Sequence, residues 1–550
     1  MTSRQTILNV VERQRDRVFL VDAFTDREIA YGDFHRQACN LASELRHRGL
    51  RKGDRIAVMV PNCCELVVLY FACIYLGAVI VPVNPALSKS DIRFILESCK
   101  PSFIVSSSVF AESLRGFDSQ VLTLVTAQDK LETESDDRKL RIDFQSASSS
   151  PFSLKSTNLH SSNIDSNLDS SNDDDLAVIM YTSGTSAKPK GLAHKIGAMF
   201  RNASAFAAVQ QIDQESRFYL SLSMSYMGGF FNLLILPFLC GASVVVDHVF
   251  DARSSLRFWE KAKRSQINTL WMAPTVLSIL LRMDRGRQGE EFCRSSVRRA
   301  FVGFAPLPLK VKTEFETRYG VKLIENYGLS ETLFVTARSR EIDAGRGYVG
   351  ESLPGVELQI VNDEGCLLPP GSEGEVQVLT PDLMAGYLDA KGQLLKTNAS
   401  AWFPTGDLGV LNHDGSLFIT GRKKDVIIRG GVNVSPAAIE ESLMQISGVF
   451  DVAVVSIAHE LYGEDIVAVL KLEPGVKLES LLDVLVAHAK DTLASHQQPA
   501  RYLEIDEFPR TANGKVQKAQ LRQLVAEKFH LSSRSSFSTA LAEPAIASGQ

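Results

Sequence analysis

The stretch that decides the fold reads Asp175-Leu-Ala-Val-Ile-Met-Tyr-Thr-Ser-Gly-Thr-Ser-Ala-Lys-Pro-Lys-Gly191. Its first part, Asp175–Tyr181, is an apolar run that predicts a buried β-strand, and this strand leads into a turn rich in glycine, serine and threonine. Hydroxyl and backbone N–H groups in such a turn can surround phosphate oxygens, while Lys188 and Lys190 supply positive charge. The spacing differs from the GxxxxGK[ST] loop, so the stretch indicates a phosphate-binding loop of another kind. Taken alone, it is also typical of an ordinary surface turn.

Two long apolar runs, Leu66–Val83 and Phe218–Val246, lie on either side of this stretch. Both reach the length at which a membrane span has to be considered. Glycine interrupts both runs, however, and Pro237 interrupts the second, so that each run has the pattern of a helix, a Gly-Ala pair and a valine-rich strand. The shared pattern predicts two similar layers of helices and buried parallel strands rather than membrane spans.

The pattern changes toward the C-terminus. Between Gly350 and Thr420, short strands alternate with turns of glycine, proline and aspartate, which predicts a β-rich subdomain. After Arg422 the helical and strand patterns predict a compact α+β domain. Two segments are too polar to bury a core, namely residues of about 146–172, which hold eleven serines, and the tail 531–550. We expect a mobile loop and a disordered tail there.

The composition is that of an ordinary globular protein of 550 residues, with 45% hydrophobic and 22% charged residues. A formal net charge of −5 argues against binding to nucleic acid or to anionic membranes and favours small-molecule chemistry. The eight cysteines form no CxxC pair, and the first residues lack the apolar core of a secretory signal. We therefore expect reduced thiols, no zinc site and a cytoplasmic protein.

Further motifs follow the phosphate-loop candidate in a fixed order: Gly303-Phe-Ala-Pro-Leu307, Asn326-Tyr-Gly-Leu-Ser-Glu331, Gly374-Glu-Val-Gln-Val378, Thr405-Gly-Asp407, Gly421-Arg-Lys-Lys-Asp425 and Pro509-Arg-Thr-Ala-Asn-Gly-Lys515. This series resembles the acyl-adenylate-forming (AMP-binding) superfamily of acyl-CoA ligases, coumarate-CoA ligases, luciferases and peptide-synthetase adenylation domains. Its members carry YTSGTTGxPKG where this chain has residues 181–191. The resemblance spans residues 20–525, and a series of motifs in register is much more specific than any one of them.

The resemblance implies a site for ATP and its product AMP. It assigns binding to Thr182, Ser183, Gly184, Thr185, Ser186, Lys190, Gly303, Phe304, Ala305, Glu325, Asn326, Tyr327, Ser330, Asp407, Arg422 and Lys515. Within this set Asp407 would accept hydrogen bonds from the ribose hydroxyls, and Arg422 would assist it. Catalysis is assigned to Lys515, Glu331 and Lys190, and Glu331 would hold Mg²⁺. Outside the series, Asp407 could simply close a turn, and Lys515 could be a solvated hairpin lysine.

The chemistry explains why these residue types are needed. Attack of a carboxylate on the α-phosphate of ATP builds charge on the phosphoryl oxygens and on the leaving pyrophosphate. Cations and fixed N–H donors therefore matter more than a general base. Transfer of the acyl group to a thiol, with AMP as leaving group, needs no such help at pyrophosphate. One lysine, Lys515 by resemblance, can therefore leave the site after the first step.

The chain departs from the family pattern at four positions. Ser186 and Ala187 replace the usual Thr-Gly, Ser330 replaces threonine, and Glu325 stands where many relatives have glutamine. The hydroxyl is kept at both serines, whereas Ala187 loses the freedom to adopt a positive φ. We expect phosphate binding to survive these changes.

The resemblance also extends to the acceptor and the acid. The segment Arg429–Pro436 resembles the glycine-bearing loop of acyl-CoA ligases, which assigns coenzyme A contacts to Gly430 and Gly431, although a plain turn would also use glycines. The acyl pocket is assigned to Tyr226, Met227, Gly228 and Gly303. For Tyr226, packing in the core is an equal alternative. The uncharged segment from Tyr226 to Phe231 favours an apolar or aromatic carboxylic acid.

The predicted function is ATP-dependent, Mg²⁺-dependent activation of a carboxylic acid to an acyl-adenylate, followed by transfer to coenzyme A. One alternative is a stand-alone adenylating enzyme that loads the phosphopantetheine thiol of a carrier protein. A luciferase-like oxidase and a non-catalytic ATP-binding module are two others.

The predicted fold is α/β. A large N-terminal domain, residues 1–421, would combine two layered βα subdomains with the β-rich subdomain. A small mobile α+β lid, residues 422–530, would rotate about a hinge at Lys424, and the active site would lie between the two domains.

Overall fold

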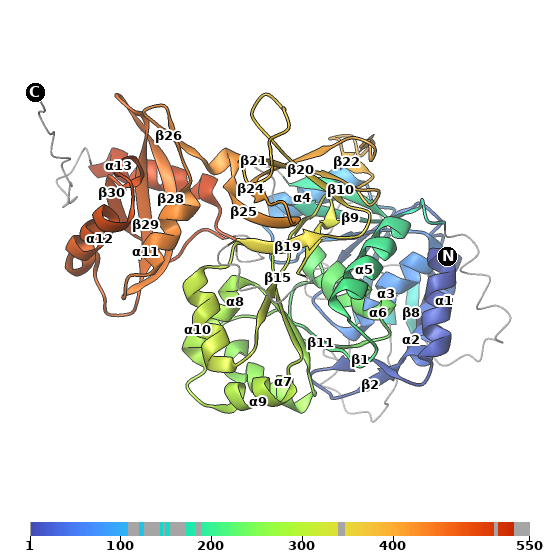
Figure 1. The fold of residues 1–550 in the computed structure, drawn as a ribbon. Coiled ribbons are helices and arrows are strands. Elements are labelled where there is room, and N and C mark those ends of the chain that lie inside the picture. The colour runs from blue at the N-terminus through green and yellow to red at the C-terminus, as the bar shows by residue number, and fades with distance from the viewer. Residues whose placement is uncertain are drawn as a thin grey trace, which may run out of the picture.

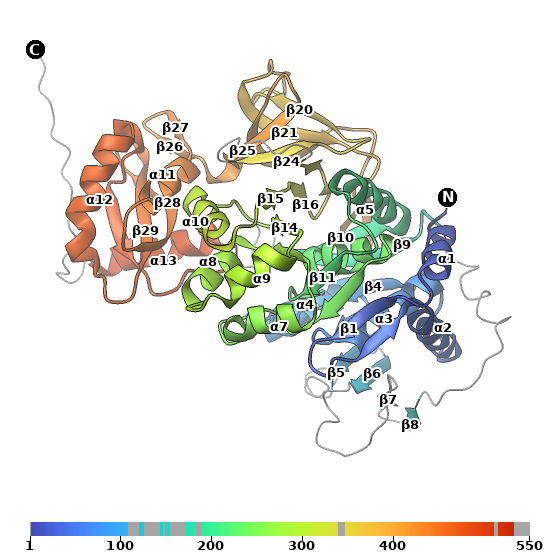
Figure 2. The same ribbon diagram turned by 60° about the horizontal axis from the view of Figure 1, so that its bottom comes forward.

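The computed structural model describes residues 2–107, 120–125, 143–146, 149–153, 172–182, 189–338, 347–510 and 515–532. These residues form the predicted α/β fold, with a large N-terminal domain and a smaller C-terminal domain (Figures 1 and 2).

The first sheet of the N-terminal domain is parallel except for one hairpin and carries much of the candidate site. Its strand order is β15-β14-β13-β11-β12-β1-β2, with β1 and β2 antiparallel. The strands are β1 (Val18–Asp22), β2 (Glu28–Ala30), β11 (Arg217–Leu220), β12 (Ser243–Val246), β13 (Thr269–Met272), β14 (Arg299–Val302) and β15 (Leu323–Glu325).

The second sheet is parallel in its centre and antiparallel at both ends. Its order is β23-β22-β10-β9-β4-β3-β5-β6-β7-β8. The strands are β3 (Arg55–Met59), β4 (Val79–Pro82), β5 (Phe103–Ser107), β6 (Gln120–Val125), β7 (Asp143–Ser146), β8 (Ser149–Ser153), β9 (Leu176–Thr182), β10 (Lys190–Lys195), β22 (Gly386–Leu388) and β23 (Leu394–Lys396).

Helices fill the space between the two sheets and cover their outer faces. One core contains α1 (Ser3–Arg13), α2 (Tyr31–His47), α3 (Cys64–Leu76), α5 (Ile196–Gln210) and α6 (Leu236–Leu239) together with residues of both sheets. The first sheet is covered on its other face by α7 (Phe258–Arg264), α8 (Pro274–Met283), α9 (Gln288–Ser296) and α10 (Leu309–Tyr319). The helix α4 (Lys89–Cys99) covers the second sheet.

The two apolar runs belong to this core, as predicted. Every residue of α3 is buried, and the helix ends at Gly77, whose φ of 66° is left-handed, before the strand β4. The second run differs in one respect, because Gly228–Ile235 forms a wide π-helix, η5, before α6. A Cβ on Gly229 would lie 2.2 Å from the carbonyl oxygen of Ser223, so this entry into the helix requires glycine. No helix of the described residues is long and apolar enough to cross a bilayer.

The β-rich subdomain is an antiparallel sheet of the order β18-β19-β25-β24-β21-β20, with a small hairpin, β16–β17, before it. The strands are β16 (Gly328–Leu329), β17 (Leu333–Phe334), β18 (Thr336–Ala337), β19 (Tyr348–Ser352), β20 (Glu357–Val361), β21 (Glu373–Leu379), β24 (Phe403–Leu411) and β25 (Ser416–Arg422). The last strand thus runs to Arg422, one residue past the predicted domain boundary.

The C-terminal domain is an α+β unit. Its sheet has the order β27-β26-β29-β28, and β30 pairs parallel with β29. Its elements are the 3-10 turns η7 (Lys423–Asp425) and η8 (Ser495–Gln497), the strands β26 (Ile427–Arg429), β27 (Val432–Val434), β28 (Val449–His459), β29 (Gly463–Leu472) and β30 (Arg501–Glu504), and the helices α11 (Pro436–Met444), α12 (Leu478–Thr492) and α13 (Lys518–Ser532).

The two domains are in contact beside α8 and α10 (Figure 2). Arg282 of α8 pairs with Glu473 at 2.8 Å, and its guanidinium lies 3.5 Å from the ring centroid of Phe450. On α10, Lys310 donates a hydrogen bond of 3.0 Å to the carbonyl of Met444. These contacts accompany the orientation of the C-terminal domain in this structure.

The segments predicted to be disordered lie largely outside the described residues. The predicted loop of about 146–172 begins differently, because Ser149–Ser153 form β8, antiparallel to β7. The prediction rested on the lack of apolar side chains in this segment. A strand at a sheet edge can nevertheless pair through its backbone without burying such side chains. Residues 154–171 and 533–550 are not described. All eight cysteines are free thiols.

Candidate active site

Two loops at the carboxyl ends of neighbouring parallel strands form the base of the candidate site. Gly303 and Phe304 follow β14, and Asn326 and Tyr327 follow β15. A Cβ on Gly303 would lie 3.5 Å from the Asn326 Oδ1 atom, so the two loops are in contact. Phe304 has a φ of 74°, which is unusual for a residue other than glycine and is typical of functional sites.

Asp407 links these loops to the β-rich subdomain. It lies inside β24, paired across the sheet with Arg422 of β25, and not at a turn as its sequence context alone allowed. Its Oδ1 is 2.7 Å from Nε of Arg422, and its Oδ2 accepts a hydrogen bond of 2.7 Å from the Tyr327 hydroxyl. The carboxylate is buried, yet each oxygen keeps a second acceptor position for a ligand hydroxyl.

Lys515 reaches the same group from the C-terminal domain. Its pKa is lowered to about 8 by burial and by the charge of Arg422, while Asp407 opposes this shift. The charges of Arg422 and Asp407 thus act on Lys515, although the three residues are far apart in the sequence.

The lowered pKa of Lys515 predicts an alkaline limit on its role as a cation. Lys515 is charged below pH 8 and loses its proton as the pH rises through about 8. We expect kcat/KM for ATP, which reports the free enzyme, to fall about tenfold per pH unit above that value. Bound triphosphate would raise the pKa of the lysine, so kcat at saturating ATP should decline only at higher pH.

Lys515→Arg provides the control for this pH dependence, because a guanidinium stays charged over the whole range. Its kcat/KM for ATP should be lower than that of the parent but should show no decline between pH 8 and about 10. If this variant and the parent decline in parallel, another group titrates, and Lys515 is not the cation in question.

The phosphate-loop candidate is described at its two ends. Thr182 and Lys190 form a cross-strand pair of β9 and β10. Lys190 is exposed at this position. Ser183, Gly184, Thr185 and Ser186 lie outside the described residues.

Glu331 lies in the turn between β16 and β17. The structure shows one contact to Glu331 and one to the preceding Ser330 that the sequence analysis missed. The Tyr387 hydroxyl donates a hydrogen bond of 2.8 Å to Glu331 Oε1, and His194 Nε2 lies 2.6 Å from the Ser330 carbonyl oxygen. Burial lowers the pKa of His194 to about 4, so its neutral ring donates this bond. No spacing rule connects these residues with Glu331, because only the packing of β10 and β22 brings them there.

Residues assigned to the acyl pocket lie beside Phe304. A Cβ on Gly228 would lie 2.6 Å from the Phe304 ring, and the hydroxyl of Tyr226 accepts a hydrogen bond of 3.0 Å from Asn84 Nδ2. Tyr226 is only partly buried, as is the neighbouring Met227. This arrangement favours a role for Tyr226 at the pocket over pure core packing.

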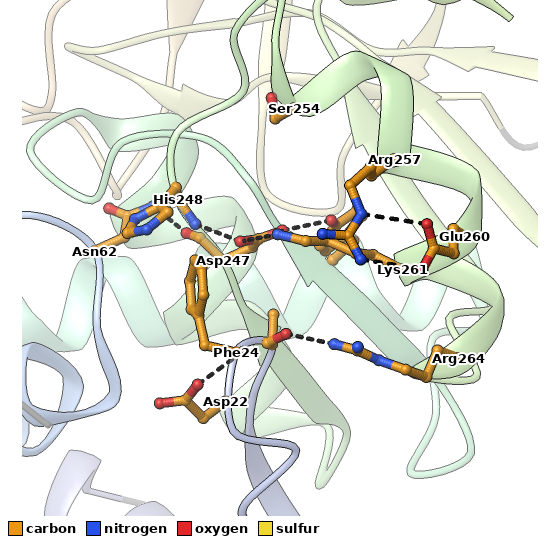
Figure 3. Close-up of polar contacts among 12 residues, drawn as sticks. Asp22, Phe24, Asn62, Asp247, His248, Ser254, Arg257, Glu260, Lys261 and Arg264 are labelled. Carbon is orange, nitrogen blue, oxygen red and sulfur yellow. Dashed lines mark hydrogen bonds and ion pairs between the residues drawn. The ribbon is translucent and has the colours of Figure 1, made fainter. Parts of the chain in front are cut away.

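A polar network fixes the loop before Tyr226. Asn62 donates to the carbonyls of Leu222 (2.9 Å) and Asp247 (3.2 Å) and accepts a bond of 3.0 Å from the Met224 backbone N–H. Asp247 is in turn held by Lys261, at 2.8 and 2.9 Å from its two oxygens, as Figure 3 shows. Asn62 thus ties the loop to the ends of two strands.

Two predicted groups do not join this cluster, whereas the charge of Lys424 acts on Lys515. Glu325 is buried and bonded at 2.8 Å to Lys312 of α10, and burial raises its pKa. Gly430 and Gly431 are exposed in the hairpin between β26 and β27, and a Cβ on Gly431 would have no neighbour within 4 Å. Lys424 is exposed within η7.

Comparison with known proteins agrees with this geometry. Residues 8–388 match the AMP-binding enzyme family, and residues 438–515 match the AMP-binding enzyme C-terminal domain. The indoleacetate–CoA ligase of Aromatoleum aromaticum is 30% identical over 524 residues, which cover 92% of this chain and 95% of that protein. The medium-chain fatty-acid–CoA ligase of Escherichia coli is 28% identical over 517 residues, covering 94% and 88%.

Solved structures show the same architecture. o-Succinylbenzoate CoA synthetase (MenE) from Bacillus subtilis, in complex with its acyl-adenylate intermediate OSB-AMP, superposes with a TM-score of 0.76 at 25% identity, covering 94% of this chain and 97% of that one. ATP-bound MatB from Rhodopseudomonas palustris gives a TM-score of 0.79 at 23% identity, covering 96% and 100%. The latter likeness concerns the fold.

Proposed function

Because this chain belongs to the AMP-binding enzyme family, we propose that it is an AMP-forming acid–thiol ligase that makes acyl-CoA from a carboxylic acid, ATP and coenzyme A. In the first step a carboxylate oxygen attacks the α-phosphorus of ATP and pyrophosphate leaves. In the second step the thiol attacks the acyl carbon and AMP leaves. The observation that carries the proposal is the buried Asp407–Arg422 pair beside Tyr327, whose charges act on Lys515 of the C-terminal domain.

The nucleotide would bind over the loops after β14 and β15. Asp407 would accept hydrogen bonds from the vicinal ribose hydroxyls, since two of its acceptor positions are taken by Arg422 and Tyr327 and two remain. Lys515 would stabilise negative charge that develops on the α-phosphate. The segment between Thr182 and Lys190 would bind the outer phosphates.

Magnesium fits this donor set. Mg²⁺ is usually held by one or two carboxylates together with substrate phosphates, and Glu331 offers one carboxylate. Among the described residues, no group of three or more His, Cys, Asp or Glu could hold a metal by itself. Glu331 would therefore hold the ion together with the triphosphate, and the ion would neutralise charge on the phosphate oxygens.

The acid would lie between Tyr226, Gly228 and Phe304. No charged side chain occurs from Tyr226 to Phe231, which favours an apolar or aromatic acid. Two relatives act on acids of this kind, indoleacetate and medium-chain fatty acids. The site would accordingly select its acid by shape and apolar contact.

Substitution of Gly228 tests this pocket. In Gly228→Ala the new Cβ would overlap the Phe304 ring, which has to move. We expect KM for the acid to rise about tenfold, and the Kd for MgATP measured by calorimetry without acid to rise clearly less, because Phe304 also borders the proposed nucleotide site. Equal losses in both would place Gly228 outside the acyl pocket.

Lys424 has the surroundings of a hinge. The residue before it, Lys423, is bound to Glu375 and Asp363 of the N-terminal domain at 3.1 Å each. The residue after it, Asp425, lies 3.7 Å from Arg522 of the C-terminal domain. Rotation about Lys424 would withdraw Lys515 and bring Gly430 and Gly431 to the path of the thiol.

The test of the proposed function is a panel of carboxylic acids incubated with enzyme, MgATP and coenzyme A. Pyrophosphate, AMP and free thioester should appear in equal amounts with at least one apolar or aromatic acid. Acyl-adenylate without free thioester would instead support loading of a carrier protein. No acid-dependent pyrophosphate from any acid would contradict the proposal. We place the enzyme in the cytoplasm, where its free thiols stay reduced.

A further inference from the structure

The turn that carries Glu331 is tightly constrained. It comprises the three residues between Leu329 and Leu333, a cross-strand pair of β16 and β17. Leu333 is buried and has a φ of 60°, a left-handed conformation that is unfavourable for a residue other than glycine. Such strain persists only where surrounding contacts determine the conformation.

Three hydrogen bonds from two strand regions hold this turn. His194 Nε2 donates to the Ser330 carbonyl (2.6 Å), the Met384 N–H donates to the Glu331 carbonyl (2.8 Å), and the Tyr387 hydroxyl donates to Glu331 Oε1 (2.8 Å). The carbonyls of Ser330 and Glu331 and one carboxylate oxygen of Glu331 are thus held.

His194 and Tyr387 come from adjacent strands. β10 and β22 are antiparallel, with Leu192 opposite Tyr387 and Ala193 opposite Gly386. β10 also begins at Lys190, directly after the phosphate-loop candidate. The strand β10 therefore contains Lys190, at the end of the phosphate-loop candidate, and four residues later His194, which contacts the turn that carries Glu331.

The chemistry of this arrangement is that of an outer hydrogen-bond shell around a metal ligand. A phenol that donates to one carboxylate oxygen fixes the rotation of the carboxylate and leaves the other oxygen for a cation. Such outer partners contribute substantially to metal affinity. The histidine is fully buried, and its Nε2 holds the Ser330 carbonyl and not the Glu331 carboxylate.

We propose that Tyr387 and His194 are positioning residues that fix the Glu331 carboxylate for the magnesium ion of bound ATP. This inference rests on the proposed function of the site. Tyr387 orients the carboxylate itself, and His194 sets the backbone of the turn relative to the phosphate loop. Neither residue touches the reacting atoms.

The test is Tyr387→Phe, which removes one hydroxyl. Calorimetry on parent and variant should compare the Kd for MgATP with the Kd for ATP in the presence of EDTA. The parent should bind MgATP more tightly, and in the variant this advantage should shrink roughly tenfold, as expected for loss of an outer-shell partner. Binding of metal-free ATP and thioester formation from supplied acyl-adenylate should be unchanged.

Tyr348→Phe is the matched control. It removes an equivalent bond, 2.7 Å from the Tyr348 hydroxyl to Glu351, in the β-rich subdomain away from Glu331. It should leave the advantage of MgATP over ATP unaltered. If Tyr387→Phe also leaves the advantage of MgATP over ATP unaltered while both half-reactions slow equally, Tyr387 is merely structural and the inference fails.

His194 provides a second, independent pair of variants. His194→Gln keeps an N–H donor at the position of Nε2, and His194→Met keeps the volume without a donor. The glutamine variant should retain most of the MgATP advantage and the methionine variant should lose it. Equal behaviour of the two overturns the role of the hydrogen bond. These measurements need no acid, so they remain decisive even if no acid in the panel yields pyrophosphate and the proposed function itself fails.

Discussion

Lys515→Ala is expected to slow acyl-adenylate formation by roughly 10²-fold or more, because one preorganised charge at a developing oxyanion is worth about 3–4 kcal/mol. The lysine is buried and feels the charges of Arg422 and Asp407 in this structure, and we propose that this arrangement serves the first step. Thioester formation from supplied acyl-adenylate and coenzyme A should stay near the parent rate. Pyrophosphate release measures the first step, and a thiol assay measures the second.

Lys490→Ala, at an exposed position of α12, is the control for loss of a positive charge in the same domain. It should leave both steps unchanged. An equal loss of both half-reactions in a folded Lys515→Ala protein would mean that Lys515 stabilises the domain, and that the C-terminal domain does not alternate between two orientations.

Gly431→Trp is expected to have the opposite effect. Acyl-adenylate should form at nearly the parent rate, whereas acyl-CoA formation should fall by roughly 10²-fold. Misplacing a reactant by about 1 Å is enough for such a loss. Gly431 is exposed, and a Cβ there would have no neighbour within 4 Å, so we expect its replacement to leave the first step free. After rotation about Lys424, the indole would obstruct the pantetheine arm.

The backbone of the hairpin has to be controlled separately. Gly430 and Gly431 have φ values of 59° and 83°, the pattern of a two-residue turn that favours Gly and Asn. Gly431→Asn tolerates this conformation and is small, so it should turn over coenzyme A almost like the parent. If the tryptophan variant also does so in a folded protein, the hairpin does not border the path of the thiol.

Much of the fold follows from local patterns in the sequence. Gly77 ends α3 and β4 follows, because a left-handed glycine and a run of valines act locally. The π-helix from Gly228 could not be predicted, since it depends on the approach of the Ser223 carbonyl to Gly229. Asp407 likewise lies inside a strand because Arg422 pairs with it across the sheet.

The candidate site likewise contains residues that the sequence indicated and residues that only tertiary packing reveals. The order of the motifs indicated Asp407, Arg422 and Lys515, and the structure pairs Asp407 with Arg422, whose charges act on Lys515. Tyr387 and His194 carry no signal of their own, because they reach Glu331 and Ser330 only through the pairing of β10 with β22. Sequence reasoning finds groups that chemistry requires, whereas the groups that orient them depend on tertiary packing.

The most direct test of the account is a two-stage reaction followed by mass spectrometry. Enzyme, MgATP and an accepted acid are first mixed without coenzyme A, and coenzyme A is then added after excess ATP has been removed. We expect enzyme-bound acyl-adenylate and one equivalent of pyrophosphate in the first stage, and conversion of that adenylate into acyl-CoA and AMP in the second. Acyl-CoA that forms only while ATP is present, with no acyl-adenylate before it, would contradict the two-step ligase mechanism.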